Sequence, residues 1–239
     1  MAINKVVYNT EDGERILIDL TSDTVTPETL AKGVTAHDAS GEKIVGTMLG
    51  GTGGNQLDAT LNGTLTEIDS EVTKVIGYAC RGITTLASVK LPNATSIATY
   101  AFYGCSGIKS LISPKVSSLG TYSFYGCSAL TEVNFPMATS VPSSAFYLCE
   151  NLTKADFGRA SSIGGYGFYS CSKLGTLILR KTDGVVSIQS TSLTSTKIAN
   201  KTGYVYVPSA LVEAYKEDSG WSAYSRRIRA IEDYPDICG

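Results

Sequence analysis

The chain has 239 residues, of which 43% are hydrophobic, and a formal net charge of -2 at pH 7. This composition excludes a disordered chain and gives no overall electrostatic attraction to nucleic acid or to an anionic membrane. No run of the roughly 18 apolar residues that a membrane helix needs is present, and charged residues interrupt the first twenty positions. We therefore expect synthesis in the cytoplasm, no signal peptide and no membrane insertion.

Residues 1–49 are polar and acidic, with four Lys or Arg against eight Asp or Glu. Alternating apolar residues flank one turn at Gly13 and another at Gly41, which predicts two β-hairpins. Between them, Thr26 before Pro27 is typical of a helix start. These features predict a small, β-rich N-terminal module.

Three further segments connect or close the domains. The glycine-rich residues 50–56 predict a flexible linker. Residues 57–77 alternate apolar and polar positions, which predicts short strands that cover the first edge of the next domain. Residues 204–239 begin with a strand pattern and continue at helical spacing through Trp221, Tyr224, Ile228 and Ile231, which predicts a C-terminal strand and helical cap.

The central residues 78–203 repeat a motif every 22 residues. Its clearest copies are Ala101-Phe102-Tyr103-Gly104-Cys105, Ser123-Phe124-Tyr125-Gly126-Cys127, Ala145-Phe146-Tyr147-Leu148-Cys149 and Gly167-Phe168-Tyr169-Ser170-Cys171. A fixed period of this length is typical of a solenoid, in which each copy forms one coil and is stable only when stacked on its neighbours. The predicted fold is mainly β with short helical turns, in about five to six coils preceded by the small N-terminal module.

The register predicts two columns of side chains inside the coils. One column holds Phe102, Phe124, Phe146 and Phe168, and the other holds Cys105, Cys127, Cys149 and Cys171. Four thiols suggest zinc, but a zinc site needs them to converge on one point, whereas a 22-residue period spreads them in a line. A ladder of small buried residues is the preferred interpretation, with neighbouring thiols near disulfide range as the alternative. Cys238 lies outside this register, and whether it is free or paired stays open.

The sequence offers no catalytic constellation. His37 is the one histidine, and it lies in an apparent turn remote in sequence from the repeat serines. No pair of carboxylates recurs at one point of the repeat, so a glycosidase dyad has no candidate. We therefore expect no catalytic residue, no metal and no cofactor.

Two surfaces are candidates for binding. One is the outward face of the repeat strands, where Lys90, Glu132, Asn134, Lys154, Asp156 and Tyr206 are expected, together with Ser88, Ser110, Ile112, Thr176, Ile178 and Tyr204. The other is a column of Tyr103, Tyr125, Tyr147 and Tyr169, with Tyr100, Tyr122 and Tyr166 close by. Tyrosine gives large, rigid contact area and a hydroxyl, which suits recognition of a sugar or a protein. Alternatively, these rings only pack on adjacent coils, an interpretation that applies more to the Tyr100 set than to the Tyr103 set.

The pattern Leu-x-x-Val-x-Leu-Pro followed by Ala-Phe-x-x-Cys over residues 78–200, with the ending from Tyr204 to Trp221, resembles the BspA-type leucine-rich repeat. That resemblance implies a leucine-rich-repeat solenoid and adhesion to host proteins or other cells, usually by secreted and wall-anchored chains. Residues 17–48 are similar to N-terminal modules of tail-associated proteins in phages and prophages of Gram-positive gut bacteria.

Together the two resemblances imply a non-enzymatic virion protein, such as a tail fibre, a baseplate component or another surface-exposed part. Residues 1–49 would attach it to other virion proteins, and the repeats would bind a bacterial surface protein or glycan. Two alternatives stay open: a purely structural spacer or decoration protein of the particle, and a BspA-type adhesin at the bacterial cell surface. The basic residues of the repeats are scattered, so no nucleic-acid partner is expected. No heptad or other symmetric signature indicates whether the chain forms a homo-oligomer.

Overall fold

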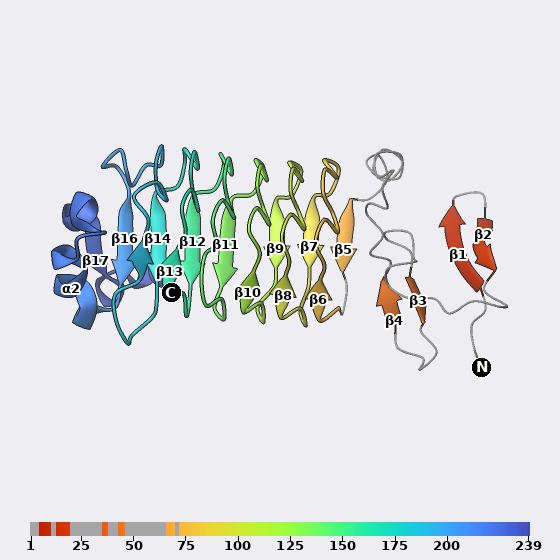
Figure 1. Ribbon diagram of the computed structural model, residues 1–239, viewed down its shortest axis with the longest axis horizontal. Helices are drawn as coiled ribbons and strands as arrows, with labels where there is room; N and C mark the ends of the chain where they lie inside the picture. The colour runs from red at the N-terminus through yellow and green to blue at the C-terminus, as the bar shows by residue number, and fades with distance from the viewer. Residues whose placement is uncertain (1–4, 11–12, 20–34, 38–42, 46–65, 70–71) are drawn as a thin grey trace. The chain divides into compact units, whose positions relative to one another are not determined.

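A computed structural model describes residues 5–10, 13–19, 35–37, 43–45, 66–69 and 72–239 (Figure 1). The chain divides into two compact units, Met1–Ala59 and Thr60–Gly239. In the first unit, β1 (Lys5–Thr10) pairs antiparallel with β2 (Gly13–Asp19), and β3 (Thr35–His37) pairs antiparallel with β4 (Lys43–Val45). Both predicted hairpins are confirmed. The predicted helix start at Thr26 and the linker at residues 50–56 lie outside the described residues.

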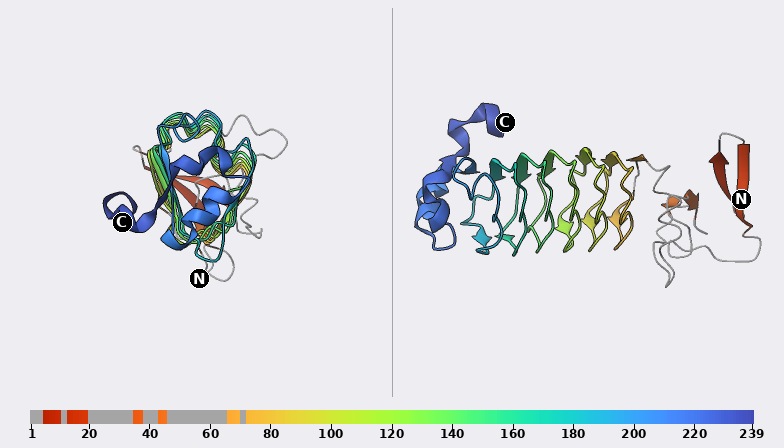
Figure 2. Two further views of the ribbon diagram at one scale, coloured as in Figure 1. Left: turned by 90° about the vertical axis from the view of Figure 1, so that its left-hand side faces the viewer. Right: turned by 90° about the horizontal axis from the view of Figure 1, so that it is seen from above.

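The second unit is a parallel β-solenoid, as the repeat predicts. Each coil gives one strand to a first side, called the strand face, a shorter strand to a second side, and a tight turn to a third side, called the turn face. The strand face holds β5 (Glu67–Asp69), β7 (Ser88–Lys90), β9 (Ser110–Ile112), β11 (Glu132–Phe135), β12 (Lys154–Phe157), β14 (Thr176–Leu179), β16 (Tyr204–Val207) and β17 (Ile228–Ala230). The second side holds β6 (Lys74–Val75), β8 (Ser96–Ile97), β10 (Ser118–Leu119), β13 (Ser162–Ile163) and β15 (Ser187–Ile188). Seen along the solenoid axis, the coils overlie one another (Figure 2).

The first described coil is already regular. β5 pairs in parallel with β7 at an offset of 21 residues, and β6 pairs in parallel with β8 at the 22-residue offset that also relates β11 to β12. Later, the offset rises to 25 residues between Ser162 and Ser187, because the sequence near Gly184 contains three residues more than the earlier coils. The extra residues lie in the loop between β14 and β15, so β13 and β15 still pair residue by residue.

The phenylalanine and cysteine columns lie inside the coils. Phe102, Phe124, Phe146 and Phe168 are at most 1% exposed, and consecutive rings stack with centroids 5.3–5.4 Å apart. The thiols of the cysteine column each donate to a different backbone carbonyl, as Cys149 does to Phe124 O at 3.2 Å. Burial raises the pKa values of the Cys127 and Cys171 thiols well above the usual range. None of the six cysteines, all of which lie in described residues, forms a disulfide, so the thiols act as small neutral packing groups.

The ladder of backbone hydrogen bonds is interrupted once on the strand face. The sheet formed by β5, β7 and β9 ends at β9, and a second sheet starts at β11, with no hydrogen bond between the two strands in the described part of the chain. At this interruption Ser113 occupies the inward position that Leu91 and Phe135 fill in the neighbouring coils. Ser113 is 3% exposed, and its hydroxyl has no hydrogen-bond partner. The third coil therefore lacks an inward apolar side chain at this position.

Replacing Ser113 by leucine is expected to raise the free energy of unfolding by about 1–3 kcal/mol, because it removes a buried unpaired hydroxyl and restores apolar contact. Urea denaturation followed by circular dichroism measures the change. Ser123→Ala is the matched control, since Ser123 is also buried and unpaired but occupies a position where adjacent coils carry alanine. A loss of stability in Ser113→Leu would show that the coils have closed over the missing volume.

The C-terminal part covers the last coil (Figure 2). It consists of η1 (Ser209–Leu211), α2 (Val212–Glu217), η2 (Ser222–Arg227), β17, η3 (Ile231–Asp233) and α3 (Pro235–Cys238). The expected helical continuation through Ile231 is wrong, because residues 228–230 form β17, which satisfies the open backbone edge of β16. None of the short helices in the described ranges has the length and apolar character of a membrane-spanning segment.

Two aromatic residues anchor this cap. Trp221 and Tyr215 are fully buried and meet edge to face at 5.4 Å. The Trp221 indole donates to Val186 O at 2.6 Å, and the Val186 N–H donates to the Tyr215 hydroxyl at 3.0 Å. Both side chains therefore form hydrogen bonds with the backbone of Val186, which lies in the coil that is lengthened near Gly184.

Stability is expected to fall between about pH 10 and pH 12. Burial raises the pKa of Tyr215 to about 12, whereas the unfolded chain releases this proton near pH 10. The folded state then holds more protons than the unfolded state, so about 2–3 kcal/mol that is present below pH 10 is lost as the pH rises to 12. Unfolding free energies measured at pH 9 and pH 11.5 test this. Tyr215→Phe should flatten that interval, and an equal slope in the variant would contradict the assignment.

Candidate functional site

Two columns of stacked tyrosines run along the turn face. The Tyr103 column comprises Tyr103, Tyr125, Tyr147 and Tyr169, with ring centroids 4.6–4.8 Å apart. The Tyr100 column comprises Tyr78, Tyr100, Tyr122 and Tyr166, with spacings of 5.0 and 4.9 Å among the first three. Rings of the two columns meet at an angle, for example Tyr100 with Tyr103 at 5.6 Å and 54°. The sequence predicts that the two sets of tyrosines lie close to each other. The stacking is the packing between adjacent coils that is the alternative to a role in binding.

The backbone gives a reason why packing does not fully explain the Tyr100 column. Each of its tyrosines has a φ between 58° and 63°, in the left-handed region. This conformation costs a residue with a Cβ roughly 1 kcal/mol or more, and glycine or asparagine meets it most easily. Ser144 holds the same place in the fourth coil with φ 55°, so the turn does not require tyrosine. Tyr78 and Tyr166 are 42% and 46% exposed, so burial in the core does not explain why tyrosine occupies these positions.

The turn face is almost uncharged. Its repeated segments carry one charged side chain, Arg81, whose guanidinium lies 5.1 Å from the Tyr103 ring centroid at the end of that column. Burial, followed by the neighbouring rings of Tyr103 and Tyr147, raises the pKa of Tyr125, so this hydroxyl stays neutral at physiological pH. Because stacked rings cover each other's faces, the surface presents ring edges and hydroxyl groups, which favour oxygen-rich, neutral ligands.

The strand face is only partly open. The segment of residues 231–238 returns over β12, β14 and β16, and its Tyr234 and Ile237 pack with Ile178, Tyr206 and Cys238. Asp156 and Tyr206, expected on the exposed binding surface, are instead 6% and 3% exposed. That expectation is corrected because a later part of the chain covers positions that strand alternation alone turns outward. Lys90, Glu132 and Asn134 are exposed as expected, and Lys154 is half-buried.

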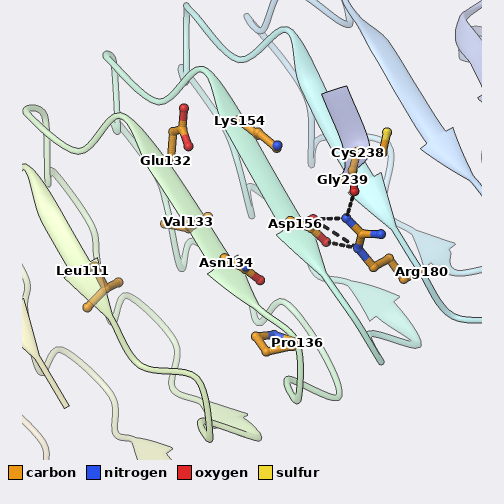
Figure 3. A pocket seen from close by; sticks show the side chains of 10 residues that line it. All are labelled: Leu111, Glu132, Val133, Asn134, Pro136, Lys154, Asp156, Arg180, Cys238 and Gly239. Carbon is orange, nitrogen blue, oxygen red and sulfur yellow. Dashed lines mark hydrogen bonds and ion pairs between the residues drawn. The ribbon is translucent and has the colours of Figure 1, made fainter. Parts of the chain in front are cut away.

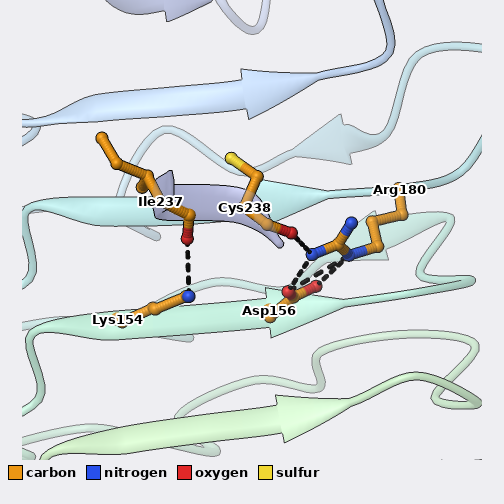
Figure 4. A network of polar contacts seen from close by, with 5 residues as sticks. All are labelled: Lys154, Asp156, Arg180, Ile237 and Cys238. Atoms are coloured by element: carbon orange, nitrogen blue, oxygen red, sulfur yellow. Dashed lines mark hydrogen bonds and ion pairs between the residues drawn. The ribbon is translucent and has the colours of Figure 1, made fainter. Parts of the chain in front are cut away.

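A polar network holds this segment in place (Figure 4). Arg180 binds both carboxylate oxygens of Asp156, at 2.7–3.1 Å, and also donates to the Cys238 carbonyl. Lys154 donates to the Ile237 carbonyl at 2.6 Å. The hydrogen bonds that Arg180 donates to Asp156 raise the pKa of Arg180, while burial raises the pKa of the Cys238 thiol. Arg180 was missed by the sequence reasoning, and an isolated carboxylate at Asp156 on an outward strand position was the available signal.

A pocket of about 540 Å³ lies beside the end of this segment (Figure 3). Its lining is Leu111, Glu132, Val133, Asn134, Pro136, Lys154, Asp156, Arg180, Cys238 and Gly239. Asp156 and Arg180 neutralise each other, and Lys154 is bound to a carbonyl, so these groups serve the C-terminal segment. Within the described ranges, no group of three or more His, Cys, Asp or Glu side chains is arranged to hold a metal ion.

Comparison with known proteins identifies a family and a similar solved structure. The BspA type leucine-rich repeat region matches residues 58–175 and 95–206, in six copies. A crystal structure of a leucine-rich repeat protein from Bacteroides ovatus is similar, with a TM-score of 0.47 and 16% identity over 87% of this chain. The chain spans 55% of the length of that protein. No curated protein matches the chain. Since the repeat match covers more than half of the sequence, the chain belongs to the BspA-type leucine-rich repeat family.

Proposed function

We propose that this protein is a non-catalytic binding protein at a cell or particle surface, and that the turn face of its solenoid contacts the ligand. The observation that carries the proposal is the Tyr100 column, where exposed or half-buried tyrosines occupy left-handed backbone positions that do not need them. An unfavourable local conformation that packing does not fully explain points to a function. Membership of a repeat family found in surface adhesins supports this proposal.

The test compares two sets of substitutions of equal number. The turn-face variant Tyr100→Ser, Tyr122→Ser and Tyr166→Ser should lose most binding of the purified protein to intact bacterial or host cells, measured by flow cytometry. The strand-face variant Lys90→Ser, Glu132→Ser and Asn134→Ser should retain it, because those side chains lie on another side of the coils. Circular dichroism confirms that both variants fold. Loss of binding only in the strand-face variant would reject the turn face as the contact surface.

Two locations are candidates for this protein: the surface of a virion and the surface of a bacterial cell. The similarity of residues 17–48 to phage tail-associated modules supports a virion component, in which residues 1–49 contact other virion proteins. Membership of the BspA-type family supports an adhesin at the bacterial surface. Immunogold labelling of purified particles with an antibody against residues 60–239 supports the first, and labelling of prophage-free cells supports the second. A structural spacer would differ from both, because its particles would adsorb equally well with the turn-face variant.

A further inference from the structure

Strand pairing is missing on two of the three sides where the third coil, with β9 and β10, meets the fourth coil, with β11. On the strand face, β9 and β11 form no hydrogen bond with each other in the described ranges, although every other pair of consecutive coils from β5 to β16 is joined there. On the second side, β10 is the last strand of its sheet, and Val141 of the fourth coil pairs with Ile163 of the fifth. Both interruptions therefore fall at the same junction.

A proline explains the interruption on the second side. In the other coils, the residue after the short strand donates its N–H to the preceding coil: Ala98 to Val75 O at 2.9 Å, Gly120 to Ile97 O at 2.7 Å and Gly164 to Val141 O at 2.8 Å. Pro142 occupies this place in the fourth coil and has no N–H, so the equivalent bond to Leu119 O cannot form. The second side keeps the bond from Thr139 N to Ser117 O, at 3.0 Å.

The turn face is as regular at this junction as at its neighbours. Phe124 donates its N–H to Ala145 O at 2.9 Å, and its ring stacks on Phe146 at 5.4 Å. Tyr125 and Tyr147 stack at 4.8 Å across the same junction. Backbone pairing and stacked rings thus hold the third and fourth coils together along the turn face.

Packing inside the strand face is less complete at the junction. Leu111 of β9 is half-buried, although Val89 and Val133 at the equivalent positions of the neighbouring coils are at most 2% exposed. Ser113 adds a buried hydroxyl without a hydrogen-bond partner. Leu111 and Val133 both line the pocket of about 540 Å³, which therefore reaches across the junction (Figure 3).

We propose that the solenoid bends at the junction of the third and fourth coils, with the turn face as the hinge. Segments open most easily where backbone hydrogen bonds are few and packing is incomplete, and here both conditions hold on the strand face and the second side. Rotation about the turn face separates the coils on these two sides and curves the solenoid toward the turn face. The tyrosine columns then lie on the inner side of the bend. This inference follows from the contacts between coils and does not rest on the proposed function.

Native-state hydrogen exchange, followed by NMR on the full chain, tests the hinge with a matched set of amides. Ser117, Thr139 and Ser161 hold equivalent places at consecutive junctions and donate to the preceding coil at 2.9, 3.0 and 2.9 Å. After correction for intrinsic rates, Thr139 should exchange at least about tenfold faster than the other two, because bending opens the junction that its bond crosses. Phe124, whose bond crosses the same junction on the turn face, should exchange as slowly as Phe146.

A single substitution should close the hinge. Pro142→Ala gives the fourth coil the residue that the second coil has at Ala98 and supplies a donor for Leu119 O. The exchange rate of Thr139 should then fall to within about threefold of its two equivalents. Pro92→Ala is the matched control, since it removes a proline from the second coil and should leave the Thr139 rate unchanged.

Three results would overturn the hinge. The first is equal exchange by Thr139 and its two equivalents in the wild type. The second is fast exchange at Phe124, which would show that the coils separate on all sides. The third is an unchanged Thr139 rate in a Pro142→Ala variant that keeps the circular dichroism of the wild type. Should that variant not fold, the two wild-type comparisons decide. No ligand enters these measurements, so the hinge can fail while the proposed function stands.

Discussion

Replacing Phe146 by alanine is expected to lower the free energy of unfolding by about 3–5 kcal/mol. The Phe146 ring is fully buried and stacks between Phe124 and Phe168, with both centroids 5.4 Å away. Phe135 and Phe157, from the strand face, each lie 6.1 Å from it. These neighbours are fixed by the register of their own coils, so they cannot collapse into the space that the ring leaves. The cavity therefore adds its full cost to the lost burial.

Tyr147→Ala is the matched control, since it removes a ring of similar size from the adjacent residue. Tyr147 is half-buried and stacks at 4.8 Å on each side, so its removal should cost about 1–2 kcal/mol. Urea denaturation of both variants gives the comparison. Equal losses would mean that the tyrosine column contributes as much to folding as the phenylalanine column, which would weaken the argument that tyrosine is retained for binding.

Replacing Trp221 by alanine should cost a comparable 3–5 kcal/mol and also promote aggregation. Trp221 is fully buried at the end of the solenoid, where it packs on Tyr215 and donates to Val186 O. Terminal caps keep solenoids soluble because the last coil otherwise exposes an apolar end and a sheet edge. Light scattering during thermal unfolding should therefore show earlier aggregation than in the wild type.

The Trp221→Phe variant separates the two contributions of this residue. It keeps most of the apolar contact and removes the indole N–H, so the Val186 carbonyl loses its partner at a cost of about 1–3 kcal/mol. Aggregation should then stay close to that of the wild type. Early aggregation of Trp221→Phe would show that the hydrogen bond, and not the ring volume, keeps the cap closed.

Much of the solenoid could be predicted from the sequence, for a local reason. A 22-residue period fixes which residues of successive coils are equivalent, and alternation along a strand fixes which side chains point inward. Phe146 and Cys149 could thus be placed inside, and Tyr147 on a neighbouring column, without coordinates. Neither inference needs to know how distant parts of the chain meet, because each coil contacts mainly its neighbours.

Contacts between segments that are distant in sequence were decided only by the tertiary structure. Asp156 and Tyr206 point outward as alternation requires, yet residues 231–238 cover them, and nothing local to β12 or β16 indicates that cover. The same holds for the exposed ring edges at Tyr166 and the left-handed backbone beneath them. Periodicity determines which residues are equivalent within a coil. Burial on the outside depends on non-repeating segments, whose position follows from the free energy of covering an apolar end and not from any repeat.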